Sequence, residues 1–451
     1  MMDIQAFLDA LFARAKCEGI EQCEAYVAAS DAFEAYVNKG EITDYAVSNS
    51  LGLSFRALIE GKMGYASTQA LDEAAIELLI EGAKTNAALI ESEDEQAFFA
   101  GGAAYLVHEL YNPALESVGA SEKLDWLKAL EACMLSQDER VKQTDACLIS
   151  SGSAQLRIVN SLGLSLSHRD NMVIAACMPV AKDGEKVSTG MGFAMARDMR
   201  DLSMKEIAEE AVDEAISALS AAPVPSGSYR IVLKNTAATS LLSAFVGIFS
   251  ADQAQKDLSL LRGREGEVIA SDAVTLMDDP FCGDGFAGAP FDAEGVPSKK
   301  KAVIERGTLT TLLHNLKTAK KQGLPASTGN ASKASYQSPV GVAPSNFYFL
   351  PGELSFEALM AQYEGGLLIT DLQGLHCANA LSGDFSLSAK GFVIEGRRMG
   401  KAVEQITISG NFYQLLKDIE CVGADLRFGF PGSVHCGSPA LGIKSLFVAG
   451  E

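Results

Sequence analysis

The sequence has few of the residues on which most hydrolases and nucleic-acid-binding proteins depend. Its 451 residues include 5 histidines, and 37 lysines and arginines stand against 58 aspartates and glutamates, a formal net charge of −21. Because clustered lysine and arginine side chains bind phosphate backbones, this charge opposes an extended nucleic-acid groove. The one basic run, Lys299–Lys301, lies in a stretch rich in glycine, proline and serine, and we expect it to form a solvated turn.

Signals for export or membrane insertion are also missing. The chain starts Met1-Met2-Asp3, with an acid where a signal peptide carries cations. The longest run without charge, Asn235–Ala251, is at the lower limit of roughly 17–25 residues for a membrane span, and we interpret it as a buried helix. Nine cysteines without framework spacing are typical of reduced thiols. We therefore expect a cytoplasmic protein without membrane association.

Common catalytic and cofactor motifs are absent or stand in the wrong context. No GxxxxGK[ST] loop and no GxSxG elbow occur. The letters GxGxxG at 283–288 lie between Pro280 and Pro290, which exclude the strand and helix of a dinucleotide site. His108-Glu109 begins like a zinc-protease motif, but no second histidine follows at helical spacing. We expect no cofactor at these segments.

Two His-Cys dipeptides, His376-Cys377 and His435-Cys436, leave hydrolytic chemistry open. Their four side chains could bind one zinc ion, or act as nucleophile and base beside a carboxylate such as Asp384. Adjacent residues of a strand point to opposite faces, so one dipeptide would rarely offer both side chains to one ion. The sequence leaves both alternatives open.

The first half of the chain repeats one order of elements. Apolar spacing predicts a helix from Ile4 to near Gly19, strands between 23 and 68, and a helix over 74–90 capped by Asp72. The order returns as a helix over about 122–136, strands over 146–194 and a helix over 204–219. The hexapeptide Asn49–Ser54 recurs as Asn160–Ser165, and we expect each copy at a turn entering a strand. These patterns predict an internal duplication.

A stretch of Pro, Gly and Ser at 222–228 is the best domain boundary. We predict an N-terminal domain over 1–221, made of duplicated halves at about 1–110 and 111–221, and a C-terminal domain over 228–451. The second domain is punctuated by glycine and rich in short strands. The predicted fold class is α+β, with a duplicated helix–antiparallel meander–helix domain followed by a β-rich domain.

Six segments of the second half stand in an order known from one protein family. They are Gly288–Gly295, Pro325–Asn330, Tyr348–Gly352, Ser382–Ser386, Glu404–Asn411 and Val422–Leu426. Together they resemble the TldD/PmbA family, also called modulators of DNA gyrase. The resemblance covers essentially the whole chain, through the closing Leu446–Gly450, and implies a barrel-like C-terminal domain.

The resemblance implies a peptidase assembly in which a TldD-type chain pairs with a PmbA-type chain, also called TldE, to cleave unfolded or extended peptides. TldD chains carry HExxxH on the helix after the first strand of the C-terminal domain, where two histidines and a later cysteine bind zinc and the glutamate activates water. The matching residues here include Ser243, Ala244 and Ile248, which supply neither imidazole nor base. This chain therefore resembles the PmbA branch, and we expect it to have no catalytic residue, metal or cofactor and no activity alone.

What the resemblance leaves to this chain is a supporting role in which its β-rich domain completes the substrate cleft of a TldD-type partner. A homodimer is the alternative assembly. An extended peptide would bind an exposed strand edge through main-chain hydrogen bonds. The expected cleft contacts are Phe245, Gly247, His376, Asn379 and Asp384.

Two other functions stay open at this point. One is an independent hydrolase that uses His376, Cys377, His435 or Cys436 with Asp384. The other is a gyrase or nucleic-acid regulator, as the older family name suggests, although the net charge of −21 opposes DNA binding.

Overall fold

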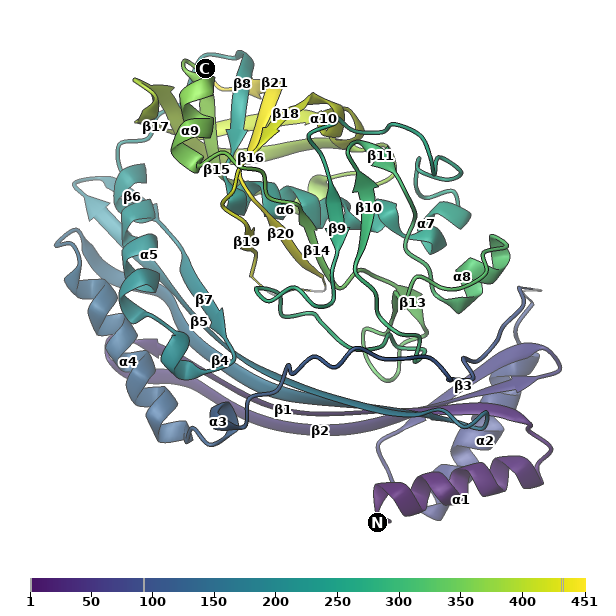
Figure 1. Ribbon diagram of the computed structural model, residues 1–451. Helices are drawn as coiled ribbons and strands as arrows, with labels where there is room; N and C mark the ends of the chain where they lie inside the picture. Colours follow the sequence, from purple (N-terminus) through teal and green to yellow (C-terminus); the bar gives the residue numbers. More distant parts are fainter. Residues whose placement is uncertain (1, 92–93, 431, 433) are drawn as a thin grey trace.

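The computed structural model describes residues 2–91, 94–430, 432 and 434–451. Its first half is built on one antiparallel sheet in the order β3-β2-β1-β4-β5-β6, with β7 also paired to β5. The strands are β1 (Gln22–Asn38), β2 (Glu41–Ile59), β3 (Lys62–Thr68), β4 (Val141–Asn160), β5 (Ser165–Asp183), β6 (Lys186–Thr189) and β7 (Gly192–Ala196). The long strands curve into a half-barrel whose concave side faces the second half of the chain (Figure 1).

Helices cover the two ends of the outer face of this sheet (Figure 1). They are α1 (Ile4–Cys17), α2 (Glu73–Ala88), α3 (Pro113–Glu116), α4 (Ala120–Ser136), the 3-10 turn η1 (Met199–Asp201) and α5 (Met204–Ala218). The Asp72 carboxylate accepts from the Ala75 N–H and caps α2, as predicted. Each helix pair closes its own apolar cluster, α1 and α2 over one end and α4 and α5 over the other.

The order helix–strands–helix occurs twice, and the two copies meet where β1 pairs antiparallel with β4, from Glu24↔Asn160 to Tyr36↔Leu148. The α+β fold class is thus confirmed. Among the strands predicted between 23 and 68, the first, β1, runs without a break from Gln22 to Asn38.

The hexapeptide repeat does not occupy equivalent positions, and this prediction was wrong. Asn49–Ser54 lies inside β2, where a Cβ added to Gly52 would stand 2.3 Å from the Tyr336 ring. Asn160–Ser165 turns β4 into β5, with the Asn160 side chain accepting from two backbone N–H groups and Gly163 at a φ of +98°. The same residue types therefore serve close packing in one copy and turn geometry in the other.

The second half contains a closed barrel in which β17, β16, β15, β8 and β21 pair in sequence and β21 pairs back to β17. Its strands are β8 (Gly227–Leu233), β15 (Leu367–Gln373), β16 (Asp384–Glu395), β17 (Arg398–Asn411) and β21 (Leu441–Ala449), with β18 (Ile419–Val422) attached to β21. Closure leaves this sheet few free edges, and the expected barrel-like domain is confirmed.

A second sheet packs beside the barrel in the order β11-β10-β9-β14-β20-β19. Its strands are β9 (Leu276–Asp278), β10 (Lys301–Glu305), β11 (Thr308–Leu309), β14 (Asn346–Phe349), β19 (Arg427–Phe428) and β20 (His435–Ser438). A separate pair consists of β12 (Ala331–Ser332) and β13 (Gly341–Val342). Short helical elements of this half include α8 (Leu316–Lys321), α9 (Phe356–Met360), α10 (Phe412–Asp418), and the 3-10 turns η3 (Ala361–Tyr363) and η4 (Leu375–Cys377).

The run without charge is not one helix. It forms α6 (Asn235–Phe245), the 3-10 turn η2 (Val246–Phe249) and the start of α7 (Ala251–Gln255), because the backbone leaves helical geometry at Phe245. Most of its apolar side chains belong to the largest core cluster, as expected for a buried segment. In the described part of the chain, no helix is long and apolar enough to cross a membrane.

The expected solvated turn at Lys299–Lys301 is wrong at its last residue. Lys301 begins β10, and its ammonium lies 2.7 Å from the Asp278 carboxylate, which is 1% exposed. Lys300 pairs with Asp279 at 2.9 Å. These lysines are fixed by buried carboxylates of β9 and the residue after it, because an unpaired buried charge is costly.

Buried charges also join the two halves of the molecule. Arg56 of β2 is 2% exposed; its Nε lies 3.0 Å from a Glu24 carboxylate oxygen, and its Nη1 lies 3.2 Å from Glu294. The Asp292 carboxylate accepts from the backbone N–H groups of Glu294 and Val296. The Asp292 carboxylate therefore holds a turn, and the Glu294 carboxylate joins the two halves through Arg56.

Candidate functional site

The segment 243–248, which the resemblance places at the HExxxH position, spans the end of α6 and the start of η2. The Ser243 hydroxyl donates to the Thr239 carbonyl at 2.9 Å, and Ile248 is fully buried. Phe245 is also fully buried, and its ring stacks on Phe412 with centroids 4.5 Å apart. The expected contact of Phe245 with a cleft is therefore wrong, because this side chain fills the core.

The His435-Cys436 dipeptide lies on β20 with its side chains on opposite faces. His435 stacks on Phe428 with centroids 4.8 Å apart, and burial, with Arg197 nearby, lowers its pKa to about 4. Cys436 is 2% exposed and belongs to the apolar core; burial raises its pKa to about 12, although the Ser243 hydroxyl acts in the opposite direction. A neutral imidazole and a protonated thiol that face apart do not make a nucleophile–base pair.

The expected contacts after η4 lie in an exposed loop. Asn379 accepts from the N–H groups of Leu381 and Ser382, and Asp384 accepts from the Asn411 amide at 2.9 Å. His376 is exposed, and η4 packs beside α6. Asn379 and Asp384 therefore shape the turn that enters β16, while their exposure leaves them within reach of another molecule.

Gly247 and Ala244 complete the set of expected residues around α6. Gly247 is exposed, and a Cβ added there would meet no atom within 4 Å. Ala244 is half-buried and packs against the main core cluster.

These residues do not fit the zinc ion of a metallopeptidase. Ser243, Ala244 and Ile248 offer no imidazole and no carboxylate at the three positions that matter, and the nearby Cys436 thiol is held protonated by burial. Over residues 2–91, 94–430, 432 and 434–451, no group of three or more His, Cys, Asp and Glu side chains could hold a metal ion.

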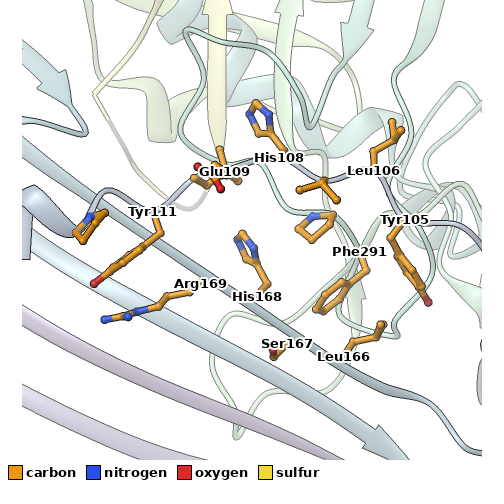
Figure 2. A pocket seen from close by; sticks show the side chains of 14 residues that line it. Tyr105, Leu106, His108, Glu109, Tyr111, Leu166, Ser167, His168, Arg169 and Phe291 are labelled. Atoms are coloured by element: carbon orange, nitrogen blue, oxygen red, sulfur yellow. The ribbon is translucent and has the colours of Figure 1, made fainter.

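A cavity of about 590 Å³ lies between the two halves of the molecule. Figure 2 shows His168 and Phe291 near its centre, with His108 above them and Tyr105 and Tyr111 at its two sides. One wall is the irregular segment 94–112, which crosses the concave side of the sheet. The Tyr105 hydroxyl anchors this segment by donating to the Gly295 carbonyl at 2.8 Å.

An unpaired strand edge forms another wall of this cavity. On the side of β5 away from β4, pairing begins only with the isolated bridge Leu110↔Asp170 and with β7 from Val173 onward, so described residues 165–169 have no strand partner there. The Asn171 N–H donates outward to Leu110 at 3.2 Å. Because alternate residues of a strand share a side, the N–H groups of Ser167 and Arg169 also point to this open edge.

A second cavity, of about 480 Å³, lies along β7 and β19. Its apolar wall includes Phe193, Phe286 and Phe428, and its cations are Arg197, which lies over the Phe286 ring, and Arg427. The Arg427 guanidinium forms an ion pair with Glu210 and donates to the Phe193 carbonyl, so it joins the two halves at this point.

The sequence did not single out these cavity walls as a site. Segment 94–112 has no periodicity, and residues 165–169 form an ordinary part of a strand. The one available signal was the adjacent pair Leu106 and Val107, two large apolar residues in a segment with no predicted helix or strand; both are exposed beside the first cavity.

Models of one protein family cover most of the chain. The PmbA/TldA metallopeptidase domain 1 matches residues 23–87, the central domain 113–219 and the C-terminal domain 226–450. The chain belongs to the PmbA/TldD family. It is therefore related to metallopeptidases, and its sequence contains no HExxxH segment.

Relatives and solved structures agree with this membership. A Thermotoga maritima protein described as a modulator of a DNA gyrase is 34% identical, with a TM-score of 0.91 over 99% of this chain and 100% of its own. The metalloprotease PmbA of Escherichia coli O157:H7 is 26% identical over 76% of this chain and 72% of its own. TldE from Thermococcus kodakarensis shares the fold, with a TM-score of 0.90 and 22% identity over 98% of this chain and 100% of its own.

Proposed function

We propose that this PmbA/TldD-family chain is the non-catalytic, PmbA/TldE-type subunit of a peptidase assembly. The observation that carries the proposal is the chemistry at the HExxxH positions, where Ser243, Ala244 and Ile248 supply neither metal ligands nor a base. A TldD-type chain would supply the zinc site, and a second copy of this chain is the alternative partner.

The open edge of β5 supports a role in holding an extended peptide. Residues 166–169 line the cavity between the two halves and, on the side away from β4, present main-chain groups without a strand partner in the described structure. Main-chain pairing holds a substrate without reading its side chains, which suits unfolded peptides of varied sequence. The exposed Gly247, His376, Asn379 and Asp384 would lie toward the partner's catalytic cleft.

The first experiment measures the zinc content of the purified chain and its digestion of unfolded casein, alone and mixed with a TldD-type chain that carries HExxxH. We expect no chelator-sensitive cleavage by the isolated chain, and cleavage together with co-elution in the mixture. Stoichiometric zinc with chelator-sensitive cleavage by the isolated chain would overturn the proposal in favour of an independent hydrolase.

A backbone variant tests the strand edge within that assembly. Ser167→Pro removes an outward N–H and leaves the pairing of β5 with β4 intact, because this N–H points away from β4. We expect a higher KM for casein with Ser167→Pro. The matched Ser167→Ala keeps the N–H and should behave as the wild type; an equal effect of both variants would count against main-chain binding at this edge.

No observation on the described residues favours a gyrase or DNA-binding role. The net charge of −21 opposes phosphate backbones, and the partly buried Lys301 is paired with Asp278.

A further inference from the structure

A second candidate site lies on the outer face of the half-barrel sheet. Figure 1 shows that α1 and α2 cover one end of this face and α4 the other, while the middle of the long strands carries no helix. A cavity of about 380 Å³ opens at the edge of α4. Its lining comes from β1, β2, β4, β5, α3 and α4 and includes Asp31, Phe33, Asn49, Glu116, Lys123 and Ser151.

Lys123, near the N-terminus of α4, is the unusual residue of this cavity. Its side chain points at the sheet and is 9% exposed. The Nζ atom donates to the Ser151 hydroxyl at 2.8 Å and lies 5.0 Å from the centroid of the Phe33 ring. In the described residues no carboxylate forms an ion pair with it, and the N-terminal end of a helix is the less favourable end for a cation.

A buried amine without a carboxylate partner lowers the stability of the fold unless a bound group interacts with it. Burial disfavours its charged form and lowers its pKa. An ammonium has three donors, and one donor is accounted for by Ser151. The remaining donors and the positive charge face a cavity large enough for a small molecule, which is the arrangement of a binding site for an anionic group.

The acidic side chains of the cavity indicate which charge the other end of the ligand carries. Glu116 is occupied, since both of its oxygens accept from Arg169, at 2.7 and 2.8 Å. Asp31 is exposed and accepts from the Asn49 amide. A simple anion would be repelled by this carboxylate, whereas a ligand with an ammonium group at its other end would pair with it.

The spacing of these groups sets the length of the ligand. Asp31 lies two residues along β1 from Phe33 and on the same face of the sheet. Because the Lys123 ammonium lies over the Phe33 ring, Asp31 is about 7 Å along the strand from the position of that ammonium. The two charged ends of an extended dipeptide are also about 7 Å apart.

We propose that the cavity between α4 and the sheet binds a dipeptide-sized zwitterion, with the ligand carboxylate on Lys123 and Ser151 and its ammonium on Asp31. Peptide hydrolysis is the class of reaction that supplies such a ligand. The inference does not rest on the proposed function, because binding is measured on this chain alone.

Acyl transfer by Ser151 with Lys123 as base is not supported by the same geometry. Ser151 lies in the middle of β4, between its partners Phe33 on β1 and Val173 on β5. The backbone N–H groups around it are therefore used in the sheet, and none remains to stabilise an oxyanion. The pair is suited to binding.

The test is isothermal titration of the full chain with L-alanyl-L-alanine. We expect saturable binding that Lys123→Met weakens about tenfold or more, since one charge-assisted contact is lost. Asp31→Asn should weaken binding in the same direction. The matched control Lys128→Met changes an exposed lysine of the same helix and should leave binding unchanged.

Two blocked ligands keep the test decisive even if Lys123→Met does not fold. The N-acetyl dipeptide lacks the ammonium and the C-terminal amide lacks the carboxylate, so each should bind at least about tenfold more weakly than the free dipeptide. Absence of saturable binding at millimolar dipeptide, equal binding by either blocked form, or wild-type affinity in a folded Lys123→Met variant would overturn the proposal.

Discussion

The two halves of the N-terminal sheet each bury a cation, and they do so in opposite ways. Arg56, at one end, is surrounded by the Glu24 and Glu294 carboxylates. Burial alone would lower the pKa of Arg56, but these two acids outweigh it and raise the pKa. Lys123, at the other end, has a serine hydroxyl and an aromatic ring, and burial lowers its pKa. A buried cation that is paired with carboxylates holds parts of the structure together, whereas a buried cation without such a pair is available to bind a ligand.

The largest effect should follow from Arg56→Met. This variant leaves two buried carboxylates without their cation at the junction of the two halves. We therefore expect the free energy of unfolding, measured by urea denaturation, to fall by about 3–5 kcal/mol. The matched control is Arg306→Met, since Arg306 pairs with Asp272 at an exposed site and its loss should lower the free energy of unfolding far less than Arg56→Met. If Arg56→Met lowered the free energy of unfolding as little as the control does, Arg56 and Lys123 would not differ in their structural roles.

The pH dependence of stability should reveal His435, which, like Lys123, is buried without a carboxylate partner among the described residues. Its pKa is lowered to about 4 by burial and by Arg197, against about 6.5 in an unfolded chain. The unfolded state therefore binds more protons between these values, and His435 costs stability as the pH falls from about 6.5 to 4, by up to about 3 kcal/mol.

His435→Phe keeps the stacking on Phe428 and should flatten the pH dependence in this window, measured by thermal unfolding at a series of pH values. His376→Phe, at an exposed histidine, should leave the pH dependence as in the wild type. Identical profiles for all three proteins would contradict a buried neutral imidazole.

Ser151→Ala sharpens the comparison at Lys123 itself. The variant removes the side-chain acceptor of the Lys123 ammonium, and we expect a loss of about 1–2 kcal/mol in the free energy of unfolding. In a chain that already carries Lys123→Met, the Ser151→Ala change should lower the free energy of unfolding much less, because the hydrogen bond between the two side chains is already absent. Additive losses would mean that Ser151 stabilises the sheet independently of Lys123.

The smallest effect is expected from Lys123→Met alone. No carboxylate loses its partner and an apolar side chain replaces a buried amine, so the free energy of unfolding should change by less than about 1 kcal/mol or rise. A thermal melt against wild type measures this. If Lys123→Met lowered the free energy of unfolding as much as Arg56→Met, Lys123 would have to be a structural residue like Arg56, which would contradict our interpretation.

Local sequence signals predicted the elements because their causes are local. The apolar spacing of α1, the Asp72 cap of α2 and the alternation of the strands each depend on a few neighbouring residues. The resemblance carried by the C-terminal segments correctly indicated the family. Repeated letters were less informative, since Gly52 and Gly163 have different tasks in their two settings.

The sequence by itself determined that this chain contains no HExxxH segment, because the order and chemical identity of its residues do not depend on the fold. Only the tertiary structure decided that Phe245 lies in the core, that β5 presents an open edge and that Lys123 contacts Ser151 with no ion-paired carboxylate among the described residues. The physical reason is that burial and pairing depend on contacts between distant segments, whereas the chemical identity of a side chain does not.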